Sequence, residues 1–158
     1  MTGILSTQDI QALLENHYTG HIACADENGP YVVPFTYYYD AETHTLLSYT
    51  AEGRKVEALR KDPRVSINIV DINALNDWQS VVIQGQFEEL EGVEAMNAIK
   101  LLITRLKTQI NQIGKDKVDA IADMSPAKET ANKVVYRIAI KEISGRFEKA
   151  SPKSELLA

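Results

Sequence analysis

Apolar residues recur at helical spacing in two long stretches of the chain. In TQDIQALLEN, Ile10, Leu13 and Leu14 share one helical face, and Ser6 with Asp9 has the spacing of an N-terminal cap. In EGVEAMNAIKLLITRLKTQI, acids lie early and basic residues late, as the helix dipole favours. The apolar stripe of this second stretch consists of Val93, Met96, Ile99, Leu102, Ile103, Leu106 and Ile110. We predict helices over residues 7–16 and 91–110.

Elsewhere the pattern alternates with a period of two and is rich in β-branched and aromatic residues. RVSINIVD places Val65, Ile67 and Ile69 on one side, and the clusters DENGP and DAET have turn composition. GRKVEALRKDP predicts one short helix that stops before Pro63, whereas INALND predicts a loop. The predicted strands cover residues 19–25, 30–39, 44–50, 64–71, 78–90 and 133–147.

Six strands joined mostly by hairpin-length turns, with three or four helices, predict a mainly β fold with α-helices. We expect a small antiparallel barrel with helices packed outside it or at its ends. The 158 residues favour one domain, over residues 1–150, followed by a loose tail at 151–158. The segment 114–132 is ambiguous, with a short helix predicted at 117–122.

Composition narrows the class of protein. Seventeen Lys and Arg against 22 Asp and Glu give a net charge of -5, which argues against a nucleic-acid partner. No apolar run approaches the length of a membrane span, and the N-terminal residues lack the pattern of a signal peptide, so we expect a cytoplasmic protein without a membrane partner. The one cysteine, Cys24, precludes an internal disulfide and is expected in the core.

The segment SYTAEGRKVEALR joins a predicted strand to a predicted helix. Thr50 supplies a hydroxyl, Gly53 permits backbone conformations that other residues resist, and the first amides of the helix carry the positive end of its dipole. Arg54 and Lys55 add two cations at the end of the helix where cations are unfavourable. Two interpretations remain open on these residues alone: a phosphate site, or a solvated turn whose cations point outward.

Other segments carry weaker signals. In PYVVPFTYYYD, Pro34 predicts a sheet edge, a bulge or a ligand-facing position, and its aromatic residues form either alternating core contacts or a wall for a planar ring. Gly85 predicts a bulge or a close approach, and Trp78 and Ser80 lie at the mouth of their strand. The acids Glu88, Glu89 and Glu91 are interpreted as a solvated strand end.

Residues able to catalyse a reaction unaided are few. His17, His21 and His44 do not have the spacing of metal ligands, and we predict no metal site; His44 is expected to be exposed in a turn. The sequence has no nucleophile elbow, Walker loop or Gly-rich dinucleotide loop. If the protein is an enzyme, a bound cofactor must carry the chemistry.

Several of these motifs together resemble those of a known family. GPYVVPFTYYYD, YTAEGRKVEALRKDPRVSINIVD, WQSVVIQGQFEEL and YRIAIKEISGRF resemble the pyridoxamine 5'-phosphate oxidase-like FMN-binding split-barrel proteins, over about Gly20 to Phe147. The resemblance implies a six-stranded split barrel that forms a homodimer with FMN at the interface. It implies that Tyr49, Thr50, Arg54 and Lys55 hold the phosphate and ribityl chain. The isoalloxazine ring would be lined by Val33, Pro34, Phe35, Thr36 and Tyr37, and touched by Ser80.

Three departures from the family pattern narrow the expected activity. Ser80 stands where the oxidases carry Gln, and Tyr49 stands where the nitroimidazole-resistance relatives carry His. The ending GRFEKASPKSELLA lacks the Trp- and Arg-rich substrate segment, so we do not expect oxidation of pyridoxamine phosphate. We expect an FMN-dependent oxidoreductase, such as a flavin reductase or nitroreductase-like enzyme, acting on a small molecule. The alternatives are a non-enzymatic flavin carrier or sensor, and a structural barrel that binds another phosphorylated ligand or none.

Overall fold

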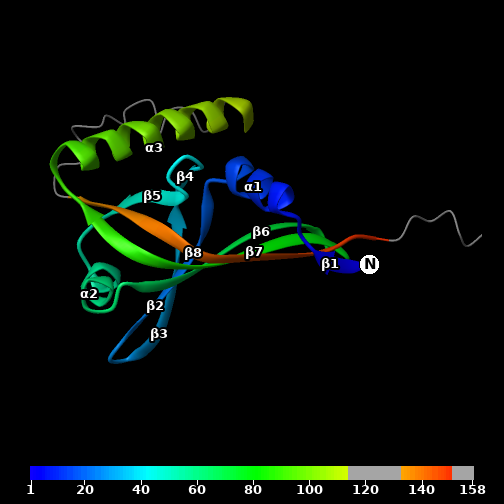
Figure 1. Ribbon diagram of the computed structural model, residues 1–158, viewed down its shortest axis with the longest axis horizontal. Helices are drawn as coiled ribbons and strands as arrows, with labels where there is room; N and C mark the ends of the chain where they lie inside the picture. The colour runs from blue at the N-terminus through cyan, green and yellow to red at the C-terminus, as the bar shows by residue number, and fades with distance from the viewer. Residues whose placement is uncertain (114–132, 151–158) are drawn as a thin grey trace, which may run out of the picture.

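The computed structural model describes residues 1–113 and 133–150, which form one sheet and three helices (Figure 1). The predicted helix at 117–122 and the predicted tail at 151–158 lie outside the described residues. The strands are β1 (Thr2–Ile4), β2 (Thr19–Asp26), β3 (Gly29–Thr36), β4 (Tyr38–Asp40), β5 (Thr45–Thr50), β6 (Arg64–Ala74), β7 (Asp77–Leu90) and β8 (Val134–Glu148). The helices are α1 (Thr7–Asn16), α2 (Arg54–Lys61) and α3 (Gly92–Ile113).

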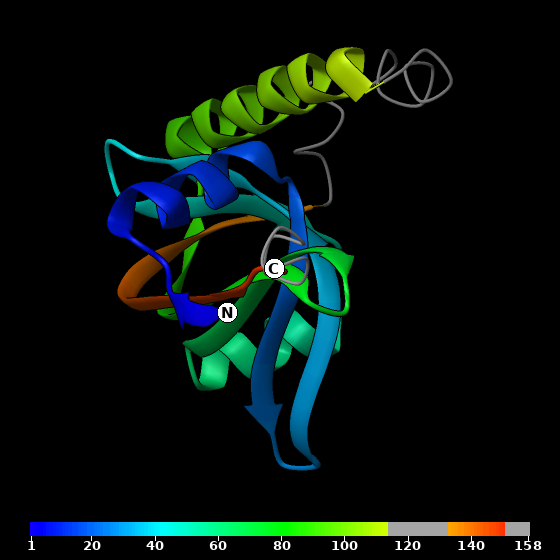
Figure 2. The same ribbon diagram turned by 90° about the vertical axis from the view of Figure 1, so that its right-hand side faces the viewer.

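All strand pairs of this sheet are antiparallel, in the order β3-β2-β6-β7-β8-β5-β4, with β1 added against β8. The two edge strands, β3 and β4, are consecutive in the chain, so the strongly curved sheet returns towards itself (Figure 2). The Ser48 hydroxyl of β5 donates a hydrogen bond of 2.6 Å to the Thr36 carbonyl at the end of β3. This arrangement confirms the predicted split barrel.

The strand count differs from the six predicted, because the described chain has eight. β1 is only three residues long, too short for alternation to reveal. The predicted strand at 30–39 is divided at Tyr37, whose amide donates to the Tyr18 carbonyl at 2.8 Å and whose hydroxyl donates to the Leu14 carbonyl at 2.9 Å. The predicted loop at 72–77 is instead mostly strand, because Ile72 pairs with Trp78 across a tight hairpin.

The barrel interior is filled by the residues that the alternation assigned to it. Val65, Ile67 and Ile69 are buried, and Cys24 is buried as expected. Gly85 confirms both predictions made for it: the β7–β8 register shifts between Gln84 and Gly85, and an added Cβ would lie 2.5 Å from Ile138 Cγ2. The backbones therefore approach there more closely than a side chain allows.

The helices cover different parts of the barrel's outside (Figure 1). α3 packs on the outer face of β5 and β8 through a cluster that contains Leu47, Ile99, Ile103 and Val135. The predicted apolar stripe is wrong at Val93, which is 76% exposed, because buried contacts of α3 begin only at Ala95. No helix among residues 1–113 and 133–150 has both the length and the apolar character needed to cross a membrane.

Candidate functional site

The join between β5 and α2 leaves the first turn of the helix open. Gly53 is the N-cap of α2 and supplies no side-chain acceptor, while Glu57 N donates to Gly53 O at 3.1 Å as the first helical bond. Gly53 has an extended φ of 165°, and nothing lies within 4 Å of an added Cβ. The prediction that glycine is needed here for its conformation is therefore wrong. Because Gly53 has no side chain, the space in front of the first amides of α2 stays open, and free helix amides suit an anion.

Arg54, the first residue of α2, is held in place on two sides. Its Nε lies 2.6 Å from Oδ2 of Asp26 and its Nη2 lies 3.2 Å from Oδ1 of the same carboxylate. Its guanidinium carbon lies 4.2 Å from the centroid of the Tyr31 ring. The hydrogen bond from Arg54 lowers the pKa of Asp26. Arg54 does not simply point into solvent, and its Nη1 makes no hydrogen bond to the described residues.

Lys55 is partly buried and has no acidic partner within ion-pair distance among the described residues. Its ammonium lies 5.7 Å from the centroid of the Tyr136 ring. Burial lowers the pKa of Lys55, because the charged form is poorly solvated there. An ammonium without a counterion, beside open helix amides, is the arrangement that an anionic ligand would complete.

The Tyr136 hydroxyl is a second unsatisfied group in this region. It is buried without a hydrogen-bond partner among the described residues. Burial raises the pKa of Tyr136 to about 12. The Ser48 hydroxyl lies close enough to lower that pKa slightly, but its geometry does not make a hydrogen bond with Tyr136 Oη. A buried polar group that lacks a partner is unfavourable and rare. Of the two groups, Lys55 is the one at the first turn of α2, and its unpaired charge suits a phosphate or a similar anion.

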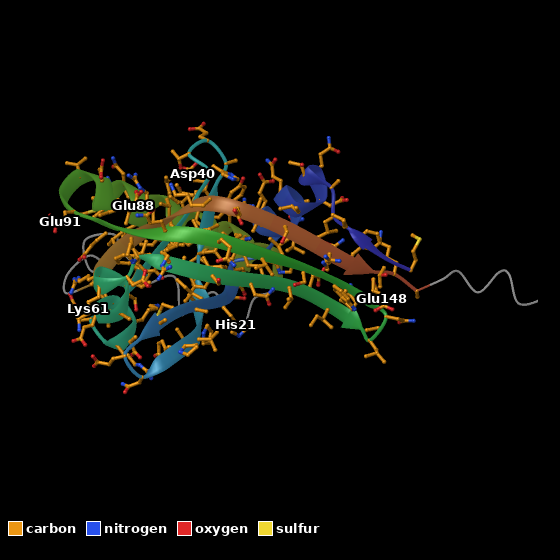
Figure 3. The ribbon with its side chains drawn as sticks, turned by 60° about the horizontal axis from the view of Figure 1, so that its bottom comes forward. His21, Asp40, Lys61, Glu88, Glu91 and Glu148 are labelled. Atoms are coloured by element: carbon orange, nitrogen blue, oxygen red, sulfur yellow. The ribbon has the colours of Figure 1, made fainter. Side chains whose placement is uncertain are left out.

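Ion pairs fix α2 relative to its surroundings. Arg60 donates to Glu52, in the turn before the helix, at 2.8 and 2.9 Å, and to Glu89 of β7 at 2.7 and 2.9 Å. Glu88 accepts a hydrogen bond from Arg137. Glu89 and Glu91 are exposed, as the interpretation of a solvated strand end requires, and Glu91 can be followed in Figure 3. That interpretation missed the ion pairs of Glu88 and Glu89. These pairs hold the loop that carries the open helix terminus.

The strand predicted to line a flavin ring is the edge strand β3 and its continuation. Pro34 is exposed on this edge, which confirms one of the positions expected for it. Phe35 and Tyr37 are 6% and 1% exposed, and their rings stack in the core at 5.6 Å. The side chains nearer the surface are Val33, Pro34 and Thr36, so the wall available to a ligand is largely backbone and small side chains.

The remaining predicted residues lie in different surroundings. Thr50 ends β5 beside the open turn, whereas Tyr49 packs against the cluster beneath α3. Ser80 accepts a hydrogen bond of 2.9 Å from Asn68 and pairs with Val70, towards the β6–β7 hairpin. That hairpin and α2 lie at opposite ends of the molecule (Figure 1). One copy of the chain therefore brings Thr50, Arg54 and Lys55 together but does not bring Ser80 to them.

Three residues of this site were not predicted. Asp26 lies in a turn cluster whose acids are ordinarily solvated, and nothing in the local pattern signals its pairing with Arg54, 28 residues away. Tyr31 and Tyr136 occupy inward positions of alternating strands, so the sequence marks them only as core residues. Their roles depend on pairings between distant strands, which the local sequence does not encode.

The sequence matches one family of known proteins over most of its length. The sequence profile of the family described as pyridoxamine 5'-phosphate oxidase matches residues 6–147. An uncharacterized protein of Rhizobium meliloti (strain 1021) is 28% identical over 91 residues, which are 58% of this chain and 59% of that protein. The match thus spans about three fifths of the length of this curated relative.

Solved structures show the same fold. A FAD-binding protein from Mesorhizobium loti is 26% identical, with a TM-score of 0.73 over 95% of this chain and 98% of that one. The FAD and heme binding protein from Mycobacterium smegmatis is 14% identical, with a TM-score of 0.73 over 97% of this chain and 76% of that one. The second likeness is one of fold alone.

Proposed function

Since the chain belongs to the pyridoxamine 5'-phosphate oxidase family, we propose that it is a flavin-binding protein that holds FMN by its phosphate at the first turn of α2. The observation that carries the proposal is Lys55, a partly buried ammonium without an acidic partner among the described residues, beside uncapped helix amides. A phosphate would supply the missing counterion and would accept hydrogen bonds from those amides.

Different residues around α2 would contact different parts of FMN. Lys55 and the amides of the first turn would hold the phosphate. The Lys55 ammonium lies 5.7 Å from the ring centroid of Tyr136, whose buried hydroxyl lacks a partner among the described residues. Arg54, already oriented by Asp26, would offer its remaining N–H groups. Thr50 would lie along the ribityl chain, and the edge of β3 from Val33 to Tyr37 would line the ring. Tyr49, which packs beneath α3, would reach the ligand at most through its backbone.

We propose further that the protein is a homodimer with the flavin at the interface. The outer face of the sheet formed by β3, β2, β6 and β7 exposes Val32, Val70, Ile72 and Val82, at 62%, 36%, 68% and 41%. The register of β2, β6 and β7 puts Ser80 on the same outer face as His21. His21 is exposed there and is labelled in Figure 3. An apolar patch of this kind suits a second copy of the chain. Ser80 of that second copy, not of the same copy, would then approach the flavin.

The proposed activity is electron transfer to or from a small molecule. Bound FMN would supply the redox chemistry, while the protein would position it and exclude water. The same binding site is equally compatible with a flavin carrier or sensor. Mesorhizobium loti's FAD-binding relative makes FAD the other cofactor to test, since FAD carries phosphate too.

Purification under native conditions tests this function. We expect yellow protein that releases FMN on denaturation, identified by chromatography against FMN, FAD and riboflavin standards. Anaerobic addition of NADH or NADPH, followed by a panel of acceptors, then separates the enzyme from the carrier: an enzyme is reduced and turns over, whereas a carrier does not. Colourless protein that binds neither added FMN nor added FAD would refute the proposal.

A further inference from the structure

A pocket of about 420 Å³ lies away from α2, between the end of α1, the strand β4 with the turn that follows it, and α3. Figure 2 shows α1 and α3 side by side, and Figure 3 shows Asp40 where β4 enters its turn. The volume falls within the range of small-molecule sites in proteins. None of the residues discussed at α2 lines it.

The lining of this pocket is negatively charged. Glu15, Asp40 and Glu42 contribute three carboxylates, against the single guanidinium of Arg105, so the formal charge is negative by two when His17 is neutral. The C-terminal end of α1 also borders the pocket. Its Glu15 carbonyl accepts a hydrogen bond of 2.9 Å from Arg105 Nη2, which is part of the lining. A helix C-terminus carries the negative end of the helix dipole and favours a cation.

Gln109 of α3 adds an unsatisfied acceptor to the lining. Gln109 is 5% exposed, and its Nε2 donates to Glu15 O at 3.2 Å, which fixes which end of the amide is the oxygen. Its Oε1 is buried without a hydrogen-bond partner among the described residues. Gln109 is one of the residues that line the pocket. The unmet need is therefore for an N–H or O–H donor.

Aromatic and apolar groups complete the walls. Tyr38 and Tyr39 are half-buried on β4, and Leu101 of α3 is 46% exposed beside them. Burial raises the pKa of Tyr39, and Glu15 and Asp40 raise it further, as expected where the local potential is negative. Tyrosine rings attract cations over their faces.

We propose that this pocket binds a small protonated amine with an apolar or aromatic body. The ammonium would lie among the carboxylates, with one N–H directed at Gln109 Oε1, and the body would rest against Tyr38 and Leu101. The recognition needs a positive charge and a donor at one end and an apolar group at the other. The pocket shares only Tyr37 with the residues proposed for the flavin, so the amine and the flavin can be tested separately.

Three probes of one shape test the charge requirement at pH 8 on the full-length protein as purified. They are 2-phenylethylammonium, the neutral 2-phenylethanol and the anionic 3-phenylpropionate, each titrated by calorimetry. We expect saturable binding of the ammonium, about tenfold tighter than that of the alcohol, and weakest binding of the acid. Equal affinities, a preference for the acid, or no saturable binding of the ammonium at millimolar concentration would each overturn the proposal.

Variants assign that binding to this pocket. Glu15→Gln with Glu42→Gln should weaken the ammonium about fourfold while leaving the alcohol unchanged, and Leu101→Trp should block every probe by filling the pocket. The matched control is Glu27→Gln with Glu57→Gln, two exposed acids outside the lining. Unfolding temperatures establish that each variant is folded. Ammonium binding that survives both pocket variants in folded protein would place the site elsewhere and overturn the proposal.

Discussion

Asp26 holds Arg54 through two hydrogen bonds, of 2.6 and 3.2 Å, so the first residue of α2 already has a counterion. The next residue, Lys55, has none among residues 1–113 and 133–150. The two cations that look equivalent in the sequence are thus in different electrostatic states. Arg54 is neutralised and oriented, whereas Lys55 is partly desolvated and available to an anion.

Lys55→Met should therefore weaken FMN more than Arg54→Met. We expect a loss of about tenfold to 100-fold in affinity for Lys55→Met, the range for a charge-assisted hydrogen bond to a partly buried ammonium. Arg54→Met should reduce FMN affinity less than Lys55→Met does, because Asp26 already offsets the charge of Arg54. The double replacement of Arg54 and Lys55 by Ala should cost at least about tenfold. Quenching of flavin fluorescence measures each affinity.

Lys61→Met is the matched control for these variants. Lys61 is an exposed lysine at the opposite end of α2 (Figure 3). It should leave FMN affinity within about twofold of the parent protein, because screening weakens charges at that distance. An equal loss for Lys55→Met and Lys61→Met would show that only the overall charge matters and that no phosphate rests on Lys55.

Tyr136→Phe separates a binding role from a structural one. The variant removes a buried hydroxyl that has no partner among the described residues, so the ligand-free protein should lose no more than about 1 kcal/mol of stability. If the hydroxyl donates to the phosphate, FMN affinity should still fall about threefold to tenfold. Denaturant unfolding and FMN titration measure the two effects. A large loss of stability with unchanged affinity would assign Tyr136 to the core alone.

Much of this fold follows from local sequence. The alternation in RVSINIVD assigned Val65, Ile67 and Ile69 correctly to the core, because one face of a half-buried strand must be apolar. Proline at position 34 indicated an edge, a bulge or a ligand-facing position, since its missing N–H would break a ladder in a central strand, and the structure places it on the edge strand β3. β1 was not predicted, because three residues carry no usable period and its pairing with β8 depends on the opposite end of the chain.

Local sequence predicts less of the site than of the fold. The sequence brought Thr50, Arg54 and Lys55 together because they are neighbours along the chain. It assigned Gly53 a conformational role that its extended φ of 165° contradicts. Asp26 and Tyr136 could not be found, since their relation to α2 arises only when β2 and β8 take their places in the barrel.

Replacement by alanine should affect stability differently at Gly53 and Gly85. Gly85→Ala would place Cβ 2.5 Å from Ile138 Cγ2 and 2.9 Å from Ala139 O, so we expect a loss of about 2–3 kcal/mol of stability. Gly53→Ala meets no atom within 4 Å and should cost about 1 kcal/mol or less, the change expected at an N-cap. Urea unfolding of both variants measures the difference, and equal losses would contradict the close packing at Gly85.

Acid should destabilise the protein partly through Arg60 and its carboxylate partners. The hydrogen bond from Arg60 lowers the pKa of Glu89 below its ordinary value. A lowered pKa in the folded state means that Glu89 stabilises the protein above its unfolded pKa and ceases to do so as pH falls through the folded value. The unfolding temperature should therefore drop between about pH 5 and pH 2.

Arg60→Met should reduce the size of that drop, because Glu89 would then titrate nearly alike in the folded and unfolded chains. Calorimetric scans across this pH range compare the variant with the parent protein. Since both side chains are partly exposed, the difference should be modest. Parallel curves for the two proteins would show that the pair does not contribute to acid sensitivity.

Titration of the flavin-free protein with FMN and with riboflavin tests the phosphate site most directly, because the two ligands share their ring and ribityl chain and differ in the phosphate. If the first turn of α2 holds that phosphate, FMN should bind at least about 100-fold more tightly than riboflavin, as two or more charge-assisted contacts require. Equal affinity for the two ligands, or no binding of either, would contradict a phosphate site at α2.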